Sequence, residues 1–152
     1  MLKNILYPDK FFEDDFLIEK KYLHRKYNLV GLKLGKSKLT NSDIDLLNNS
    51  SALVAGINFK IDKEIISMLD NCRIITRGGV GFDLIDIEEC KKKNIPVCNV
   101  PDYGTCEVAD HTLSLILNFT RGVSYYNYVL NSSLKNNWNY SNEKSITSLL
   151  NK

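Results

Sequence analysis

The sequence has 152 residues, of which 43% are hydrophobic and 25% are charged, and its formal net charge is +2. These values are ordinary for a soluble globular protein with one hydrophobic core. The lysines are scattered apart from a short cluster at 91–93, so we expect no nucleic-acid partner. The apolar runs are too short to cross a bilayer and the N-terminus lacks a secretory signal, so we expect a cytoplasmic protein with no membrane partner.

The first part of the chain alternates between β-type runs and helical patterns. Residues 4–7 are typical of a short strand, and the spacing of apolar residues over 14–27 predicts an amphipathic helix. A second strand is expected over 28–34. It is followed by a helix that Ser42 can cap together with Asp45.

Three further strands are expected, at 51–57, 72–77 and 95–100. Asp62 can cap the helix after the first of them, and Asp86 can cap the helix after the second. That second helix is expected to end near Lys93, because Asn94 suits a left-handed stop and Pro96 follows. Short strands that alternate with helices imply parallel pairing through crossovers, so the predicted fold class is α/β with an open parallel sheet.

The pattern changes after Pro101. Thr105 can cap a long helix that ends at Gly122, and this helix is apolar around most of its circumference, so it must be buried against a large surface. The tail, 123–152, is rich in Tyr, Asn and Ser and shows weak helical periodicity. The chain therefore divides into residues 1–100 and residues 101–152.

Residues 75–86, with the sequence ITRGGVGFDLID, raise the question of a cofactor loop. Gly79 and Gly81 match the start of a G-x-G-x-x-G fingerprint, but Leu84 stands at the third glycine position and the following helix is short. These two failures argue against a dinucleotide loop. The loop does lie at the carboxyl end of a strand, and its small residues can present bare N–H groups beside the guanidinium of Arg77. The residues alone leave two readings open: a site for a small anion, and a glycine turn required only by the topology.

The chain holds four cysteines, Cys72, Cys90, Cys98 and Cys106. They show no C-x-x-C spacing and no partnered His pair, so we expect reduced thiols, with neither a metal site nor a disulfide framework. His24 lies in a charged helical pattern and is expected to be exposed. The pair Tyr125 and Tyr126 is assigned to packing or to an interface.

Residues 73–122 carry several motifs in a fixed order. These are an R-x-G-x-G-x-D-x-I-D loop at 77–86, an I-P-V-x-N-V-P strand at 95–101 and a V-A-D-H-T-L segment at 108–113. Together they resemble the D-isomer-specific 2-hydroxyacid dehydrogenases, and within them the branch that holds phosphoglycerate-dehydrogenase-like enzymes and the C-terminal-binding proteins. Residues 1–70 agree only in the alternation of elements. The resemblance implies a flavodoxin-like sheet with helices on both faces. It makes 1–100 the substrate-binding domain and 101–152 an interdomain helix and dimerisation arm.

The resemblance also implies a function for the glycine loop. In the family, the backbone amides of this loop hold the carboxylate of the substrate, so Gly79, Val80 and Gly81 are assigned as amide donors. Arg77 would pair with the anionic end of the substrate, and Val108 would line the nicotinamide side of the cleft. The implied substrate is a small anionic 2-hydroxy or 2-oxo acid, and the implied cofactor is NAD or NADP.

The same resemblance places the nucleotide-binding domain and the catalytic Arg, Glu and His downstream of residue 152, so no catalytic residue is expected in this chain. His111 is assigned a structural role on the same grounds. We therefore expect the N-terminal part of an NAD(P)-dependent oxidoreductase that is inactive alone and forms a homodimer. The alternatives are a protein-interaction (corepressor-like) module, an inactive relic of the family, or a free-standing flavodoxin-like or receiver-like domain. The last of these needs a phosphate loop or an acidic pocket near the first strand, but the acids that follow Pro8 stand in a helical context.

Overall fold

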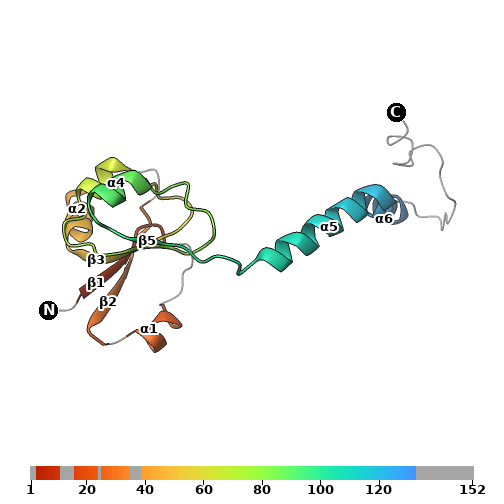
Figure 1. Ribbon diagram of the computed structural model, residues 1–152. Helices are drawn as coiled ribbons and strands as arrows, with labels where there is room; N and C mark the ends of the chain where they lie inside the picture. The colour runs from red at the N-terminus through yellow and green to blue at the C-terminus, as the bar shows by residue number, and fades with distance from the viewer. Residues whose placement is uncertain (1–2, 11–15, 24, 35–38, 133–152) are drawn as a thin grey trace. The chain divides into compact units, whose positions relative to one another are not determined.

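The structure is a computed structural model that describes residues 3–10, 16–23, 25–34 and 39–132. The chain forms two compact units, Met1–Tyr103 and Gly104–Lys152, and each is described by itself (Figure 1). The expectations for His24 and for the arm over 133–152 lie outside the described residues.

The first unit is built on a five-stranded sheet with the order β2-β1-β3-β4-β5, in which every neighbouring pair is parallel. The strands are β1 Lys3–Tyr7, β2 Tyr27–Gly31, β3 Ser50–Ala55, β4 Ile75–Arg77 and β5 Val97–Cys98. This strand order is that of flavodoxin-like sheets, so the predicted fold class is confirmed.

Four helices connect these strands in the described part of the first unit: α1 Glu19–Tyr22, α2 Asn41–Asn48, α3 Lys63–Ser67 and α4 Ile87–Lys92. Figure 1 shows α2 and α4 on one side of the sheet and α1 on the other. This arrangement follows from parallel pairing, because each crossover must carry the chain back across one face of the sheet.

Two of the predicted helix caps are confirmed. The Asp62 carboxylate accepts hydrogen bonds from the Glu64 and Ile65 amides at 3.1 and 3.3 Å, at the start of α3. The Asp86 carboxylate accepts one from the Glu89 amide at 3.0 Å, at the start of α4. Asn94 follows α4 with a φ of 57°, the left-handed stop that its residue type suggested.

The predicted cap of α2 is wrong by two residues. Thr40, not Ser42, is the N-cap: its Oγ1 accepts from the Asp43 amide at 3.3 Å, and the Asp43 carboxylate accepts from the Thr40 amide at 2.8 Å. This reciprocal capping box satisfies two backbone donors at once, which a Ser42 cap would leave unpaired. The hydrogen bonds from Thr40 also lower the pKa of the Asp43 carboxyl below its usual value.

The helix predicted over 14–27 is much shorter in the structure. The backbone of Phe16 has a φ of 55°, and α1 begins only at Glu19. The Phe16 side chain is buried, with its ring 4.8 Å from the ring of Tyr7 on β1. Tertiary packing of this aromatic pair therefore overrides the helical periodicity of the segment, and Tyr27 at its end belongs to β2.

The core of the first unit lies between the sheet and α2, α3 and α4. Leu6, Leu53 and Ile75, from the three central strands, are at most 1% exposed. The same cluster includes Leu47 of α2 and Ile66 of α3. These contacts fix the strand positions and with them the loops at the carboxyl end of the sheet.

The second unit contains α5 Thr105–Arg121 and α6 Val123–Ser132, separated by Gly122 with a φ of 65°. The predicted stop at Gly122 is confirmed, but the N-cap of α5 is Gly104, without a side-chain cap, and Thr105 is the first helical residue. No residue of α5 is buried, so the burial expected for this helix is not found among the described residues. The rings of Tyr125 and Tyr126 meet edge to face, with 5.5 Å between the ring centroids. No described helix is long and apolar enough to cross a membrane.

Candidate functional site

The candidate site lies at the carboxyl end of the sheet, where loops follow three adjacent parallel strands. The glycine loop, residues 78–86, follows β4, and the β3 loop, residues 56–62, follows β3. Residue Asn99 begins the segment that follows β5. Open α/β sheets bind ligands at the carboxyl ends of their strands, and the glycine loop lies there.

The last residue of β3 anchors one end of the glycine loop, and the β3 loop anchors the other end. The Gly78 amide donates to the Ala55 carbonyl at 3.2 Å at the start of the loop. At the other end, the Ile61 amide donates to the Leu84 carbonyl at 2.8 Å and the Asp86 amide donates to the Ile61 carbonyl at 3.0 Å. The backbone of Leu84 is therefore used for the loop itself, although its side chain replaces the third glycine of a nucleotide fingerprint.

The segment after β5 binds the middle of the glycine loop. The Val100 amide donates to the Gly79 carbonyl at 3.0 Å, and the side-chain amide of Asn99 donates to the Val80 carbonyl at 2.9 Å. The carbonyls of two consecutive loop residues thus face the end of β5. By contrast, no described group accepts a hydrogen bond from the amides of Gly79, Val80 or Gly81. The backbone N–H groups of these three consecutive residues therefore have no hydrogen-bond acceptor among the described residues.

Arg77, the last residue of β4, lies against this loop. A Cβ atom placed on Gly79 would be 3.0 Å from Arg77 Nη1 and 3.2 Å from Arg77 Cζ, so the guanidinium covers the Gly79 backbone. The φ of Gly79 is not positive, so the backbone does not require glycine, and a Cβ here would displace the guanidinium by a few tenths of an ångström. No carboxylate of the described residues forms an ion pair with Arg77. The loop itself carries the carboxylate of Asp83, whose Oδ2 is 3.3 Å from the position of a Cβ on Gly81.

Asp9 is a buried carboxylate that the sequence analysis assigned to a helical context, and the structure corrects this. Asp9 follows β1, is 8% exposed and pairs with Lys33 in an isolated antiparallel bridge. Its carboxylate accepts from the Gly56, Asn58 and Phe59 amides at 2.9, 2.7 and 3.1 Å. Asp9 therefore holds the β3 loop in place, and that loop in turn anchors the glycine loop. One signal in the sequence points to this role, an acid two residues after the end of the first strand.

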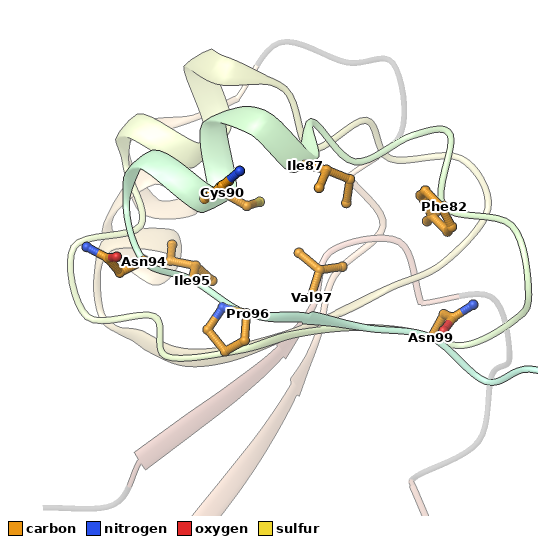
Figure 2. A pocket seen from close by; sticks show the side chains of 9 residues that line it. Phe82, Ile87, Cys90, Asn94, Ile95, Pro96, Val97 and Asn99 are labelled. Atoms are coloured by element: carbon orange, nitrogen blue, oxygen red, sulfur yellow. The ribbon is translucent and has the colours of Figure 1, made fainter.

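An apolar groove of about 570 Å³ lies between α4 and β5, as Figure 2 shows. Its lining residues are Phe82, Ile87, Cys90, Lys91, Asn94, Ile95, Pro96, Val97 and Asn99. Phe82 and Asn99 lie at one end of the groove and Asn94 at the other. A large apolar pocket is the usual first choice for a ligand site, but this one lacks converging polar groups and includes none of residues 77–81. Phe82 of the glycine loop lines one end of the groove, but the residues of the predicted carboxylate site, 77–81, do not line it.

Val108 and His111 lie on α5 in the second unit, and both are exposed. The assignment of Val108 to the nicotinamide side of the cleft stays a prediction.

The four cysteines differ in their exposure to solvent. All four thiols are free: Cys72 and Cys90 are buried, while Cys98 and Cys106 are exposed. Burial raises the pKa of the Cys90 thiol to about 11, and the Asp86 carboxylate adds to this effect. Burial likewise raises the pKa of Cys72. The described residues include no group of three or more His, Cys, Asp or Glu side chains placed to hold a metal ion.

A parallel sheet in this order is that of a flavodoxin-like domain, and its glycine loop lies beside an arginine at the carboxyl end of the sheet. Comparison with known proteins identifies the family. Residues 13–150 match the catalytic domain of the D-isomer specific 2-hydroxyacid dehydrogenases, and the chain belongs to this family.

Individual relatives agree with this assignment. A Staphylococcus aureus protein named "Putative 2-hydroxyacid dehydrogenase" is 34% identical over 119 residues, which cover 70% of this chain and 37% of the relative. A Staphylococcus epidermidis protein of the same name is 38% identical over 77 residues, or 51% of this chain and 24% of the relative. The chain thus spans well under half of the length of these relatives.

Two solved structures are similar in both fold and sequence. One is D-lactate dehydrogenase from Aquifex aeolicus in complex with NAD and lactic acid, with a TM-score of 0.69 and 25% identity over 91% of this chain and 41% of that one. The other is 3-phosphoglycerate dehydrogenase of Entamoeba histolytica with bound NAD+, with a TM-score of 0.62 and 25% identity over 80% of this chain and 40% of that one.

Proposed function

We propose that this chain is the substrate-binding part of an NAD(P)-dependent 2-hydroxyacid dehydrogenase, and that its glycine loop binds the carboxylate of a small 2-hydroxy or 2-oxo acid. One observation carries the proposal. The amides of Gly79, Val80 and Gly81 are unused at the carboxyl end of β4, directly beside a guanidinium that has no carboxylate partner among the described residues. Unpaired backbone donors and a cation in one place form an anion site.

The chain's own residues would bind and orient the acid. The backbone amides would hold the carboxylate, and the guanidinium of Arg77 would pair with it or with a second anionic group of the substrate. Asp83 belongs to the loop and is exposed, so solvent screens its repulsion of the bound anion. An acid held at the loop would have its C2 in a defined position, which is the requirement for hydride exchange.

The glycine loop does not fit a dinucleotide. The third glycine position is Leu84, and α4, which follows the loop, has only six residues. A nicotinamide cofactor, when bound, supplies hydride exchange with C2 of the acid. We propose that NAD or NADP is bound mainly by residues outside these 152, with Val108 on the nicotinamide side. Calorimetry of this chain with NAD should show no binding at micromolar concentration, and micromolar affinity would contradict the division of roles.

The carboxylate site can be tested by NMR titration of the 152-residue chain with pyruvate as the probe. We expect saturable shifts of the Gly79, Val80 and Gly81 amide resonances. Arg77→Ala should weaken binding about tenfold or more, because a charge-assisted hydrogen bond is lost. Arg73→Ala is the matched control, since Arg73 lies before β4, at the opposite end of the strand. A wild-type chain whose loop amides do not respond would overturn the proposal and favour the interaction-module or relic alternatives.

We further propose that the protein forms a homodimer through α5. Its apolar side chains are exposed: Leu113, Leu115, Ile116, Leu117 and Phe119 are each between 51% and 56% exposed. Soluble monomers rarely expose contiguous apolar patches of more than a few hundred Å². Light scattering at tens of micromolar should give a mass of about twice 17.4 kDa. A stable monomer of 17.4 kDa would refute the dimer.

A further inference from the structure

We propose that Asn99 is a positioning residue for the carboxylate site: its side-chain hydrogen bond to the Val80 carbonyl sets the direction of the Gly81 N–H group. This inference rests on the proposed carboxylate site and adds a residue that does not touch the substrate itself.

The argument begins with the geometry of the peptide bond. A trans peptide is planar, and its C=O and N–H groups point in opposite directions. The Val80 carbonyl and the Gly81 amide belong to one peptide plane. When Asn99 Nδ2 holds the Val80 oxygen at 2.9 Å, the Gly81 N–H must point away from the end of β5.

The preceding peptide plane is held in the same way. It contains the Gly79 carbonyl and the Val80 amide, and the Val100 backbone amide donates to that carbonyl at 3.0 Å. Two consecutive amides, those of Val80 and Gly81, are therefore turned away from β5 and toward a common side. Convergent backbone amides of this kind bind anions. Without the two anchors, a loop of glycines could rotate either plane at little cost, because glycine tolerates both signs of φ.

Asn99 is the side chain on which this arrangement depends. The other anchor is a backbone amide that substitution cannot remove, except by proline. An asparagine side chain supplies the required N–H donor, whereas an aspartate in its place would present only acceptor oxygens to the Val80 carbonyl. Asn99 is exposed and lies past the two-residue strand β5, so its loss should leave the core of the first unit intact.

The experiment is a pyruvate titration of the 152-residue chain followed by NMR, in wild type, Asn99→Ala and Asn99→Asp. Asn71→Ala is the matched control, because the Asn71 side chain also donates to a backbone carbonyl, that of Asn48 at 2.8 Å, away from the glycine loop. Asn99→Ala should weaken pyruvate binding about two- to tenfold, as expected for the loss of one neutral hydrogen bond. Asn99→Asp should weaken it further, and Asn71→Ala should leave it unchanged.

A second readout needs no ligand. The Val80 carbonyl 13C resonance should move in Asn99→Ala, since it loses its hydrogen bond, and should not move in Asn71→Ala. If wild type binds pyruvate and Asn99→Ala binds it equally well, the role of Asn99 is overturned while the carboxylate site stands. Equal weakening in both alanine variants would show a general loss of stability and would also overturn it. A wild-type chain that does not bind overturns the proposed function and this inference together.

Discussion

Removal of the Asp9 carboxylate should destabilise the first unit more than removal of any exposed acid. Asp9 is 8% exposed, and its two oxygens accept three backbone hydrogen bonds at 2.7 to 3.1 Å. In Asp9→Ala the amides of Gly56, Asn58 and Phe59 lose their acceptor. The β3 loop then loses its attachment to β1, and the anchor of the glycine loop weakens with it.

The magnitude follows from the count of bonds and from their burial. An unsatisfied buried donor costs about 1–3 kcal/mol, but the amides of Gly56 and Asn58 are only partly buried and water can reach them. The charged carboxylate also loses hydration on burial, which offsets part of the gain. We therefore expect Asp9→Ala to lower the free energy of unfolding by about 3 kcal/mol. Asp9→Asn should cost about half as much, because its single oxygen can still accept two of the three bonds.

The assay is urea denaturation of the 152-residue chain followed by circular dichroism at pH 7. With a slope of about 1.5 kcal/mol per molar urea, Asp9→Ala should lower the midpoint by about 2 M. Asp62→Ala is the control: it removes a half-buried helix cap with two longer bonds and should cost about 1 kcal/mol. The reasoning is refuted if Asp9→Ala unfolds at the wild-type midpoint, or shifts it less than Asp62→Ala does.

Three further predictions concern the same unit and its thiols. Gly56→Ala should lower the free energy of unfolding by about 1–3 kcal/mol in urea denaturation, because its Cβ would lie 2.6 Å from both Asp9 oxygens. Gly78→Ala is the control and should cost far less, because the nearest atom to its Cβ would be 4.0 Å away. Equal costs in the two variants would contradict the argument. A thiol reagent should modify the exposed Cys98 and Cys106 rapidly in the folded chain and the two buried cysteines only after denaturation, so four fast-reacting thiols would contradict the burial. Cys90 is protonated when folded, with a pKa raised by burial from 9.0 to about 11, so its contribution to stability is complete below pH 9 and is lost as the pH rises through 11. The loss should amount to at most about 3 kcal/mol, and a Cys90→Ala variant with the same alkaline stability profile as wild type would disprove it.

The local signals in the sequence predicted most of the elements correctly. The carboxylates of Asp62 and Asp86 cap α3 and α4 as expected, and Asn94 and Gly122 end their helices in the left-handed conformation. These features depend on groups within four residues of one another, so the sequence contains all of the partners. The helix expected over 14–27 failed because Phe16 packs on Tyr7 of β1, a contact that periodicity does not reveal.

The sequence by itself determined the α/β class, the family and the loop that carries the proposed site, since the motif run from Arg77 to Leu113 keeps its residues in fixed order. Only the tertiary structure decided how that loop is held. The Asp9 carboxylate reaches amides 47 to 50 residues away, and Asn99 reaches a carbonyl at a separation of 19. The strand order determines these partners, because it places the carboxyl ends of β1, β3, β4 and β5 side by side at one edge of the sheet. A hydrogen bond across that edge has no local signature, because the physical constraint is the position of neighbouring strands and not the sequence between them.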